Sequence, residues 1–394
     1  LPCKVLEIPG LGYDQTNTFT PNPSQVAEKI LNIISDTWPA GCDVLHVHNP
    51  TLAKNRQFLQ ILNGLQQAGV NLFLQIHDFA EDGRPDFYYD EAYPKDCHYG
   101  VINRRDYSIL TKAGLKREGL HLLANTVAPI SVPDALVSKP QILYPVRAIR
   151  RKNIGEALLL SMFFKHGERL VVTQPPNSPV DLVCYQQWVE WVRKAGLRVD
   201  FDAGKNDEFA TLVAVSESVL TTSISEGFGL AFLEPWTAGK QLWGRRIGGI
   251  CNDIEKNGIY LDHLYEQLHI PLNWFDRDAF GREWTRAVIS AADRYDHTIA
   301  TSEIDDVYSS LIEGGHVDFG LLSEKFQRQV LAWLTVHSSA KKELVLLNPW
   351  LSDPGEVPDP AVLIETNRRA VAKHYDIQTY RDRLLNIYNA VICH

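Results

Sequence analysis

Glu226 and Glu234 lie eight positions apart, and a Gly-Phe-Gly-Leu stretch follows the first of them. The apolar residues 219–224 predict a buried strand, and residues 230–239 predict a helix that places Glu234 about two turns along the same face. The turn between them would direct free N–H groups and the positive end of a helix dipole at an anion such as phosphate. Carboxylates repel phosphate but accept hydrogen bonds from hydroxyl groups. The segment therefore predicts a ligand with phosphate between two polyhydroxyl groups, such as a nucleotide sugar.

A group of four cations follows the predicted strand 142–145: Arg147, Arg150, Arg151 and Lys152. When a bond between a sugar and phosphate breaks, negative charge grows on the leaving oxygen, and fixed cations lower that barrier. The structural alternative is a solvated basic helix start, but positive charge at a helix amino terminus is unfavourable. We therefore predict that these cations bind phosphate groups.

The pattern from Glu226 to Glu234 resembles the E-x7-E motif of retaining glycosyltransferases with the GT-B architecture, most of all family 4. The resemblance covers roughly residues 1–255 and the last helix. It implies an α/β protein with two doubly wound Rossmann-like domains that face each other across a cleft. It also implies metal-independent, retaining transfer of a hexosyl group from a nucleotide sugar to a hydroxyl of a small molecule or saccharide. By family frequency, a UDP-sugar donor is favoured and GDP-mannose is second.

The resemblance also implies how the donor is bound. Glu234 would accept hydrogen bonds from the ribose hydroxyls. Arg147 and Lys152 match the arginine and lysine that hold the donor diphosphate in similar enzymes, and Arg150 or Arg151 can replace its neighbour in this assignment. The other residues expected to bind the donor come from the turn between the glutamates and from the segment that lines the base pocket: Gly227, Phe228, Gly229, Leu230 and Gly204.

Glu226 and the backbone of the turn would hold the hydroxyls of the transferred sugar. His77, followed by Asp78, ends a predicted strand of the first domain, and in similar enzymes a histidine there reaches the sugar near its reacting carbon. A purely structural histidine is the alternative. Glycines after the first predicted strand would let the backbone approach a ligand closely. The residues expected to form this acceptor or phosphate loop are Gly10, Leu11, Gly12 and Asp78.

Three motifs found at other kinds of site are set aside. Asp200-Phe201-Asp202 has the D-x-D form that binds a metal in single-domain glycosyltransferases, but in the resembling fold this segment lines the base pocket. His46 and His48 share one strand face, as zinc can require, yet no third ligand is near in sequence. Asp318-Phe319-Gly320 is similar to a kinase triplet without the accompanying kinase loops. We therefore predict no metal and no cofactor, with the nucleotide sugar as a co-substrate.

The elements that must position these residues alternate strand and helix in two series, separated by a polar linker at 131–140. The first series has predicted strands at 3–8, 44–47, 71–76, 99–103 and 120–124, and its first helix follows Ser24 as N-cap. The second has predicted strands at 142–145, 169–173, 197–201 and 219–224. Such alternation predicts parallel sheets, which bind ligands at the carboxyl ends of their strands.

The predicted domains follow from the two series. Residues 1–138 form an acceptor domain and residues 139–370 a donor domain, while the terminal segment 371–394 carries one amphipathic helix, 371–392, that packs back on the first domain. A helix-rich elaboration rich in aromatic residues occupies about 258–347, and its role is open.

The composition is that of a globular enzyme: 394 residues, 45% hydrophobic and 22% charged. A net charge of −9 argues against general binding to nucleic acid or to anionic membranes. No apolar run reaches the roughly 20 residues that span a bilayer, and the amino terminus lacks a signal pattern. We therefore expect a cytoplasmic protein without an integral membrane segment, and the oligomeric state is open.

Two other classes of function fit the same architecture. An isomerase of the nucleotide-sugar 2-epimerase kind would use carboxylates to move a ring proton, so solvent hydrogen would enter the sugar without an acceptor. A non-catalytic nucleotide-sugar-binding protein would bind the ligand and release no nucleotide. The isomerase would share the phosphate-binding cations, so hydrogen exchange from solvent discriminates it from the transferase. The non-catalytic alternative is disfavoured because cations that can neutralise a leaving diphosphate are present.

Overall fold

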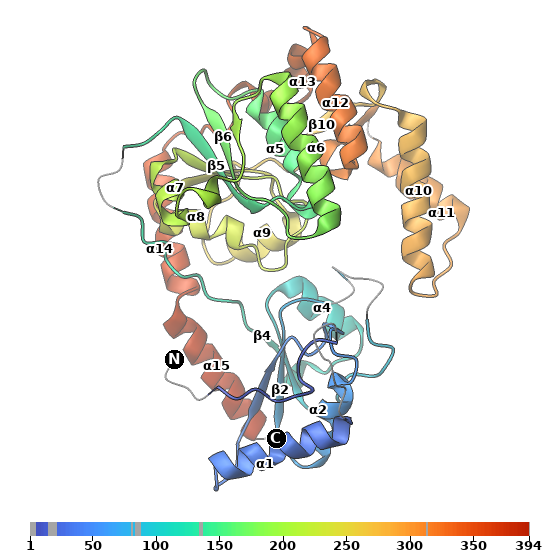
Figure 1. Ribbon diagram of the computed structural model, residues 1–394, viewed down its shortest axis with the longest axis vertical. Coiled ribbons are helices and arrows are strands. Elements are labelled where there is room, and N and C mark those ends of the chain that lie inside the picture. Colours follow the sequence, from blue (N-terminus) through green and yellow to red (C-terminus); the bar gives the residue numbers. More distant parts are fainter. Residues whose placement is uncertain are drawn as a thin grey trace. The chain divides into compact units, whose positions relative to one another are not determined.

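The computed structural model describes residues 5–14, 22–79, 82, 88–133, 137–312 and 314–393. The chain divides into two compact units, one of Leu1–Thr126 with Ile377–His394 and the other of Val127–Asp376. Each unit has its own parallel sheet with helices packed on it, so the α/β class predicted from the sequence is confirmed (Figure 1). The units divide at residues 126 and 376, whereas the predicted domains divide at 138 and 370.

The first unit is built on a four-stranded parallel sheet in the order β1-β2-β3-β4. Its strands are β1 (Leu45–His48), β2 (Leu72–Ile76), β3 (His98–Val101) and β4 (Leu120–Leu122). Its other elements are α1 (Pro23–Thr37), α2 (Phe58–Gln67), α4 (Arg104–Lys112), the short η1 (Arg117–Gly119) and α15 (Ile377–Ile392).

Strand β2 is buried on both faces, and its alternating side chains show what covers each one. Leu72 and Leu74 belong to a core that α1, α2 and α4 complete. Phe73 points the other way and packs with Leu123, Ile387 and Val391, the last two from α15. The last helix of the chain is therefore part of the core of the first unit.

The second unit has a five-stranded parallel sheet in the order β7-β6-β5-β8-β9. Its strands are β5 (Gln141–Arg147), β6 (Arg169–Gln174), β7 (Val199–Asp200), β8 (Ser218–Thr221) and β9 (Gln241–Gly244). Helices α5 (Ile154–Ser161), α6 (Pro179–Ala195), α7 (Phe209–Val215), α8 (Glu234–Thr237), α9 (Gly248–Glu255) and α14 (Pro360–His374) belong to it. Because the direction of strand addition reverses between β5 and β8, the loops after these two strands flank the switch point, where such sheets bind ligands.

The elaboration lies within the second unit. A two-stranded antiparallel ribbon, β10 (His269–Pro271) with β11 (His316–Asp318), links its helices. These are α10 (Arg277–Asp293), α11 (Thr301–Leu311), α12 (Glu324–Val336) and α13 (Ala340–Leu347). Helices α10 and α11 lie side by side (Figure 1).

Two predictions at the amino terminus are wrong. In the described part of the predicted strand 3–8 no strand forms: Val5 and Leu6 are 81% and 46% exposed, and Ile8 packs partly buried against the core. Residues 3 and 4 lie outside the described residues. Helix α1 begins at Pro23, one residue before the predicted cap, and Asn22 is the N-cap, accepting a hydrogen bond from the Ser24 amide at 2.9 Å. Proline favours the first helical position because its φ is already helical.

Two predicted helices are interrupted. The helix predicted at 230–239 is a 3₁₀ turn, η4 (Leu230–Phe232), followed by α8, because Pro235 has no N–H to continue the first turn. Glu234 therefore begins a new helix and does not continue the face of the first. The helix predicted at 371–392 is split between α14 and α15, since Tyr375 is buried and its carbonyl accepts a hydrogen bond from Val127 at 2.9 Å.

Candidate functional site

The loops after β5 and β8 lie against each other at the switch point of the second sheet. The Ile224 amide donates to the Arg151 carbonyl at 2.9 Å, and Thr222 Oγ1 contacts the carbonyls of Lys152 and Asn153 at 3.0 and 3.1 Å. The hydroxyl of Tyr144 also binds the Lys152 carbonyl. These bonds fix the backbone of the cationic loop beside the segment that carries Glu226.

Glu226 is paired with two of the predicted cations. Its side chain is 8% exposed; Lys152 Nζ contacts Oε1, and Arg151 Nη1 donates to Oε2 at 2.8 Å. Burial alone would raise the pKa of Glu226. The charge and hydrogen bond of Lys152, together with a hydrogen bond from Ser223 and the charge of Arg151, outweigh burial and lower the pKa. Glu226 is therefore a stable carboxylate. Arg151, with a side chain 47% exposed, keeps donors available to a ligand.

Glu234 shows the opposite balance. Burial raises its pKa, and the charge of Lys152 only partly opposes the shift. Lys152 therefore acts electrostatically on both glutamates, one through direct contact and the other through space. The structure brings Lys152 into contact with Glu226, and Glu234 lies near enough to be affected by the same charge.

The turn after Glu226 needs its glycine at position 229. Gly229 has a φ of +89°, and a Cβ there would lie 2.6 Å from Ile250 Cγ2. The preceding Phe228 packs against Tyr375, with ring centroids 5.8 Å apart. Leu230 is 42% exposed at the start of η4. The glycine lets the chain leave β8 and pass close to α9 without a side chain between them.

Arg147 and Gly204, which were also predicted to bind the donor, lie on elements that carry neither glutamate. Arg147 is the exposed last residue of β5, and within the described chain no ion pair joins it to either glutamate. Gly204 lies in η3 (Ala203–Lys205), and a Cβ there would be 3.0 Å from the Thr173 carbonyl at the end of β6. Asp202, from the discounted D-x-D segment, binds Lys205 and Tyr185, each at 2.6 Å.

His77 follows β2 at the carboxyl edge of the first sheet. Its Nε2 lies 2.9 Å from His48 Nδ1, and its amide donates to Asn49 Oδ1 at 2.7 Å. Burial, and then the neighbouring His48, lower the pKa of His77, while a hydrogen bond with Asn125 opposes them. The imidazole is therefore neutral near pH 7. His48 is the last residue of β1 and His77 follows the adjacent strand β2, but the sequence pattern did not reveal that the two imidazoles pair.

The glycine loop in the first unit is held by a residue that the sequence did not single out. Asn55 is 7% exposed, and its Nδ2 donates to the carbonyls of Gly10 at 2.7 Å and Gly12 at 3.0 Å. Gly10 has a φ of +98°. Leu11 packs partly buried against the core, and Asp78 is exposed. The loop is thus an ordered backbone surface.

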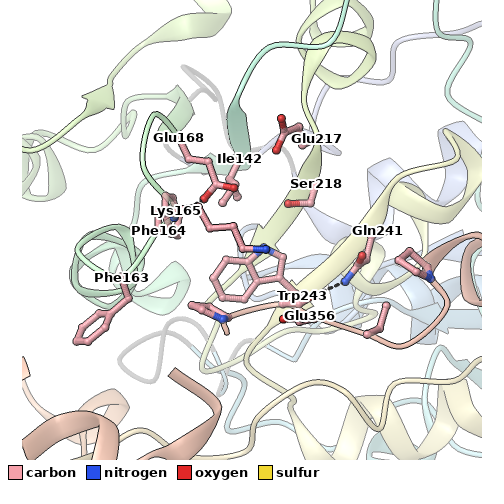
Figure 2. A pocket seen from close by; sticks show the side chains of 14 residues that line it. Ile142, Phe163, Phe164, Lys165, Glu168, Glu217, Ser218, Gln241, Trp243 and Glu356 are labelled. Atoms are coloured by element: carbon pink, nitrogen blue, oxygen red, sulfur yellow. Dashed lines mark hydrogen bonds between the residues drawn. The ribbon is translucent and has the colours of Figure 1, made fainter. Parts of the chain in front are cut away.

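A separate cavity of about 330 Å³ lies in the second unit (Figure 2). Its lining includes Ile142, Ser218 and Gln241, which stand at the amino ends of β5, β8 and β9. Phe163 and Trp243 also line it. Because the glutamates follow carboxyl ends of strands, this cavity is at the opposite edge of the sheet and is not part of the candidate site.

Within the ranges that the structure describes, no group of three or more histidine, cysteine or acidic side chains is placed to hold a metal ion. No described helix combines the length and apolarity needed to cross a bilayer.

A comparison with curated proteins finds a relative, mannosylglucosyl-3-phosphoglycerate synthase from Petrotoga mobilis, 28% identical over 268 residues. The match covers 58% of this chain and 52% of the relative, so the chain spans about half the length of that relative. No protein-family model matches the chain.

Solved structures share the fold across nearly the whole chain. A glycosyltransferase from Rickettsia africae has a TM-score of 0.56 at 14% identity and covers 96% of this chain and 84% of its own. HepE from Anabaena, in complex with UDP-glucose, has a TM-score of 0.53 at 11% identity, with 94% and 85% covered. Sucrose-phosphate synthase from Thermosynechococcus elongatus has a TM-score of 0.52 at 11% identity, with 96% and 81% covered. The predicted GT-B fold is confirmed, while membership of family 4 stays a prediction.

Proposed function

We propose that this protein is a metal-independent, retaining glycosyltransferase that moves a hexosyl group from a nucleotide sugar to a hydroxyl of a small-molecule or saccharide acceptor. The observation that carries the proposal is Lys152, which contacts Glu226 and acts on the pKa of Glu234 beside the switch point of the second sheet. A cation that acts on two carboxylates suits a ligand in which phosphate is flanked by hydroxyl-bearing groups.

In this proposal the second unit holds the donor and the first unit the acceptor. Glu234 accepts hydrogen bonds from the ribose, and Arg147 and Lys152 bind the diphosphate, with Arg151 beside them. UDP-sugars are favoured because the HepE neighbour was solved with UDP-glucose. GDP-mannose is second, supported by the mannosyl group in the name of the Petrotoga relative. That name also describes a small-molecule product, which supports a small acceptor.

The transfer itself is proposed to occur on one face of the sugar. The bond from the anomeric carbon to the diphosphate breaks, and a bond to the acceptor oxygen forms on the same face. The acceptor proton passes to the departing phosphate oxygen, which gives a glycoside and a nucleoside diphosphate. Lys152 stabilises the charge on the leaving group, while Glu226 and the backbone at 228–230 hold the sugar hydroxyls.

The first unit is proposed to contribute residues that bind the transferred sugar and the acceptor. His77 contacts the transferred sugar, so a sugar hydroxyl would share or replace its hydrogen bond with His48 or Asn125. The Gly10–Gly12 backbone and Asp78 contribute to an acceptor or phosphate loop. A neutral His77 can donate or accept a hydrogen bond, as contact with a hydroxyl requires.

A panel of nucleotide sugars in a thermal-shift assay tests the proposal. A donor at 100 times its dissociation constant adds about 2.7 kcal/mol to stability, which raises Tm clearly. The stabilising donor is then incubated with hydroxylated acceptors, and NMR reads the anomeric configuration of the product. Retention and nucleotide release support the proposal. Stabilisation by no nucleotide sugar contradicts it, and solvent deuterium in the sugar without an acceptor would indicate the isomerase.

A further inference from the structure

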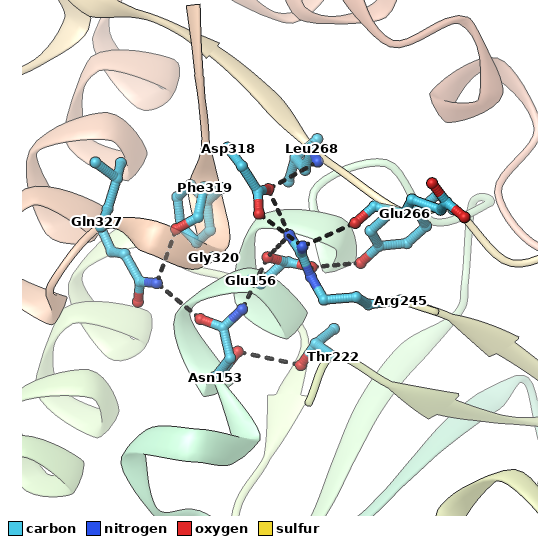
Figure 3. Close-up of polar contacts among 12 residues, drawn as sticks. Asn153, Glu156, Thr222, Arg245, Glu266, Leu268, Asp318, Phe319, Gly320 and Gln327 are labelled. Atoms are coloured by element: carbon cyan, nitrogen blue, oxygen red, sulfur yellow. Dashed lines mark hydrogen bonds and ion pairs between the residues drawn. The ribbon is translucent and has the colours of Figure 1, made fainter. Parts of the chain in front are cut away.

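The loop that carries Arg151 and Lys152 is hydrogen-bonded to the helix-rich elaboration as well as to the segment that follows β8. Arg150 Nη2 donates to the carbonyls of Gly320 at 3.2 Å and Leu322 at 2.7 Å. From α12, Gln327 Nε2 donates to Asn153 Oδ1 at 2.7 Å (Figure 3). Two residues that flank the site cations are therefore fixed by a segment about 170 positions later in the sequence.

Asn153 is the residue on which these contacts converge. It is 1% exposed and has a φ of +59°, a left-handed conformation that is uncommon outside glycine. Such a conformation persists only when its surroundings hold it. Its Nδ2 donates to Glu156 Oε2 at 2.8 Å, while its Oδ1 accepts from Gln327. Gly155 leaves room for this, because a Cβ there would overlap the Gln327 amide.

A buried ion network anchors the same segment to the sheet (Figure 3). Arg245, with a side chain 5% exposed, donates twice to Glu156, each time at 2.7 Å, and twice to Asp318 at 2.8 and 2.7 Å. The hydroxyl of Tyr265 donates to Glu156 at 2.6 Å. Bidentate guanidinium–carboxylate pairs fix orientation as well as distance. Arg245 therefore holds β11 and the start of α5 in a fixed position relative to each other.

We propose that residues 316–327 of the elaboration are a positioning element for Lys152 and Arg151, with Gln327 as its main positioning residue. Gln327 holds Asn153 in its left-handed conformation, and Arg150 holds the other side of the loop. The two site cations between them are thereby directed toward Glu226. The significance of this position for a diphosphate depends on the proposed function.

The first test needs no ligand. Hydrogen–deuterium exchange is measured on the peptides that contain the amides of Lys152, Asn153 and Ile224, which bond to loop carbonyls at 2.9 Å. We expect at least tenfold faster exchange in Gln327→Leu. The matched control is Val330→Ala, an equally buried residue of the same helix, in which exchange of these peptides stays within twofold. Unchanged exchange in Gln327→Leu overturns the proposal.

If the Gln327→Leu protein does not fold, a second variant tests the same proposal. Arg150→Lys shortens the reach to the Gly320 and Leu322 carbonyls and is only partly buried, so the fold is expected to survive. The same tenfold acceleration is expected in the peptides at 151–154. Exchange equal to that of the wild type in the folded Arg150→Lys protein overturns the proposal.

A thermodynamic cycle then separates positioning from general stabilisation. The dissociation constants of UDP and GDP are measured for wild type, Gln327→Leu, Lys152→Ala and the double variant. A positioning residue acts through Lys152. Gln327→Leu should therefore weaken nucleotide binding at least tenfold when Lys152 is present, and less than twofold in the Lys152→Ala background. Equal losses in both backgrounds overturn the proposal. If the wild type binds neither nucleotide, the proposed function fails while the exchange result still decides this inference.

Discussion

At the scale of single residues, the two glutamates of the turn are in different electrostatic states although they share one lysine. Lys152 contacts Glu226 and lowers the pKa of Glu226 despite its burial, whereas burial dominates at Glu234 and raises the pKa of Glu234. Sequence spacing alone does not distinguish the electrostatic states of these two carboxylates. The difference arises because Lys152 can make direct contact with only one of them in this structure.

Because the two pKa values shift in opposite directions, removing the charge of Glu226 and removing that of Glu234 should change the stability of the fold in opposite directions. The lowered pKa of Glu226 means that its charge stabilises the fold above the ordinary pKa of 4.5, and this is lost as the pH falls through the folded pKa. The raised pKa of Glu234 means that its charge costs stability once the pH has risen above the folded pKa. At pH 7 we expect a lower Tm for Glu226→Gln and a higher Tm for Glu234→Gln.

The Tm difference of Glu234→Gln should disappear as the pH falls from the raised folded pKa to 4.5, whereas that of Glu226→Gln should shrink as the pH falls below 4.5. A series of thermal melts measures both. A stabilising Glu234→Gln that also loses donor binding would mark Glu234 as a ligand-binding residue, because functional sites commonly cost stability. Parallel Tm changes of the same sign in the two variants at pH 7 would show that the assigned states are wrong.

The lysine itself gives a binding prediction. Lys152→Ala should weaken nucleoside diphosphate binding by roughly 10- to 100-fold, since a hydrogen bond to a charged group contributes about 1.5–3 kcal/mol. Isothermal titration calorimetry measures this. The control is Lys165→Ala, an exposed lysine that lines the cavity at the opposite edge of the sheet. Equal affinity in wild type and Lys152→Ala would exclude Lys152 from the donor site.

At the scale of elements, the turn between β8 and η4 depends on backbone geometry that only glycine provides. Gly229→Ala would place a methyl group in the left-handed region and against Ile250, so we expect a loss of about 3 kcal/mol from strain and overpacking together. Gly239→Ala is the control, because its φ is also positive, at +67°, but nothing lies within 4 Å. There we expect about 1 kcal/mol. Urea unfolding measures both, and equal losses would contradict the close approach to Ile250.

The strands in the sheets were largely predictable because buried parallel strands are continuous apolar runs between polar turns. Strands β1, β2, β6 and β8 each lie within or close to their predicted ranges. The interruptions at Leu233 and Tyr375 were not predicted, since the apolar periodicity continues through both. The first interruption is caused by Pro235, directly after Glu234, and the second by the hydrogen bond from the Val127 amide to the Tyr375 carbonyl.

The residues that hold the site residues in place were harder to predict than the site residues themselves. Glu226, Glu234 and Lys152 were predicted from type and spacing; the structure pairs Lys152 with Glu226, and the charge of Lys152 also acts on Glu234. Asp318 was set aside as a chance kinase triplet, yet it pairs with Arg245, 73 positions earlier. His48 and Asn55 likewise act through tertiary contacts. No local pattern reveals a pairing over such distances.

At the scale of the whole molecule, helix α15 packs into a core with residues more than 250 positions earlier in the sequence. Ile387 is 6% exposed and packs with Phe73 and Leu123. Ile387→Ala should cost the first unit about 2–4 kcal/mol, whereas Leu385→Ala, on an exposed position of the same helix, should stay within about 0.5 kcal/mol. Chemical unfolding monitored by near-UV circular dichroism compares the two. Similar small losses would show that α15 contributes little to this core.

Turnover by Glu226→Gln tests the central claim most directly. The claim is that the cluster at the switch point binds an activated sugar and stabilises its transfer. With the donor found by thermal shift, release of nucleoside diphosphate in the presence of acceptor is compared among wild type, Glu226→Gln and Glu217→Gln, an exposed glutamate beside the cavity at the other edge. Removal of one such stabiliser costs about 3 kcal/mol of barrier, so Glu226→Gln should be about 100-fold slower while Glu217→Gln matches the wild type. Equal turnover in all three proteins would contradict the account.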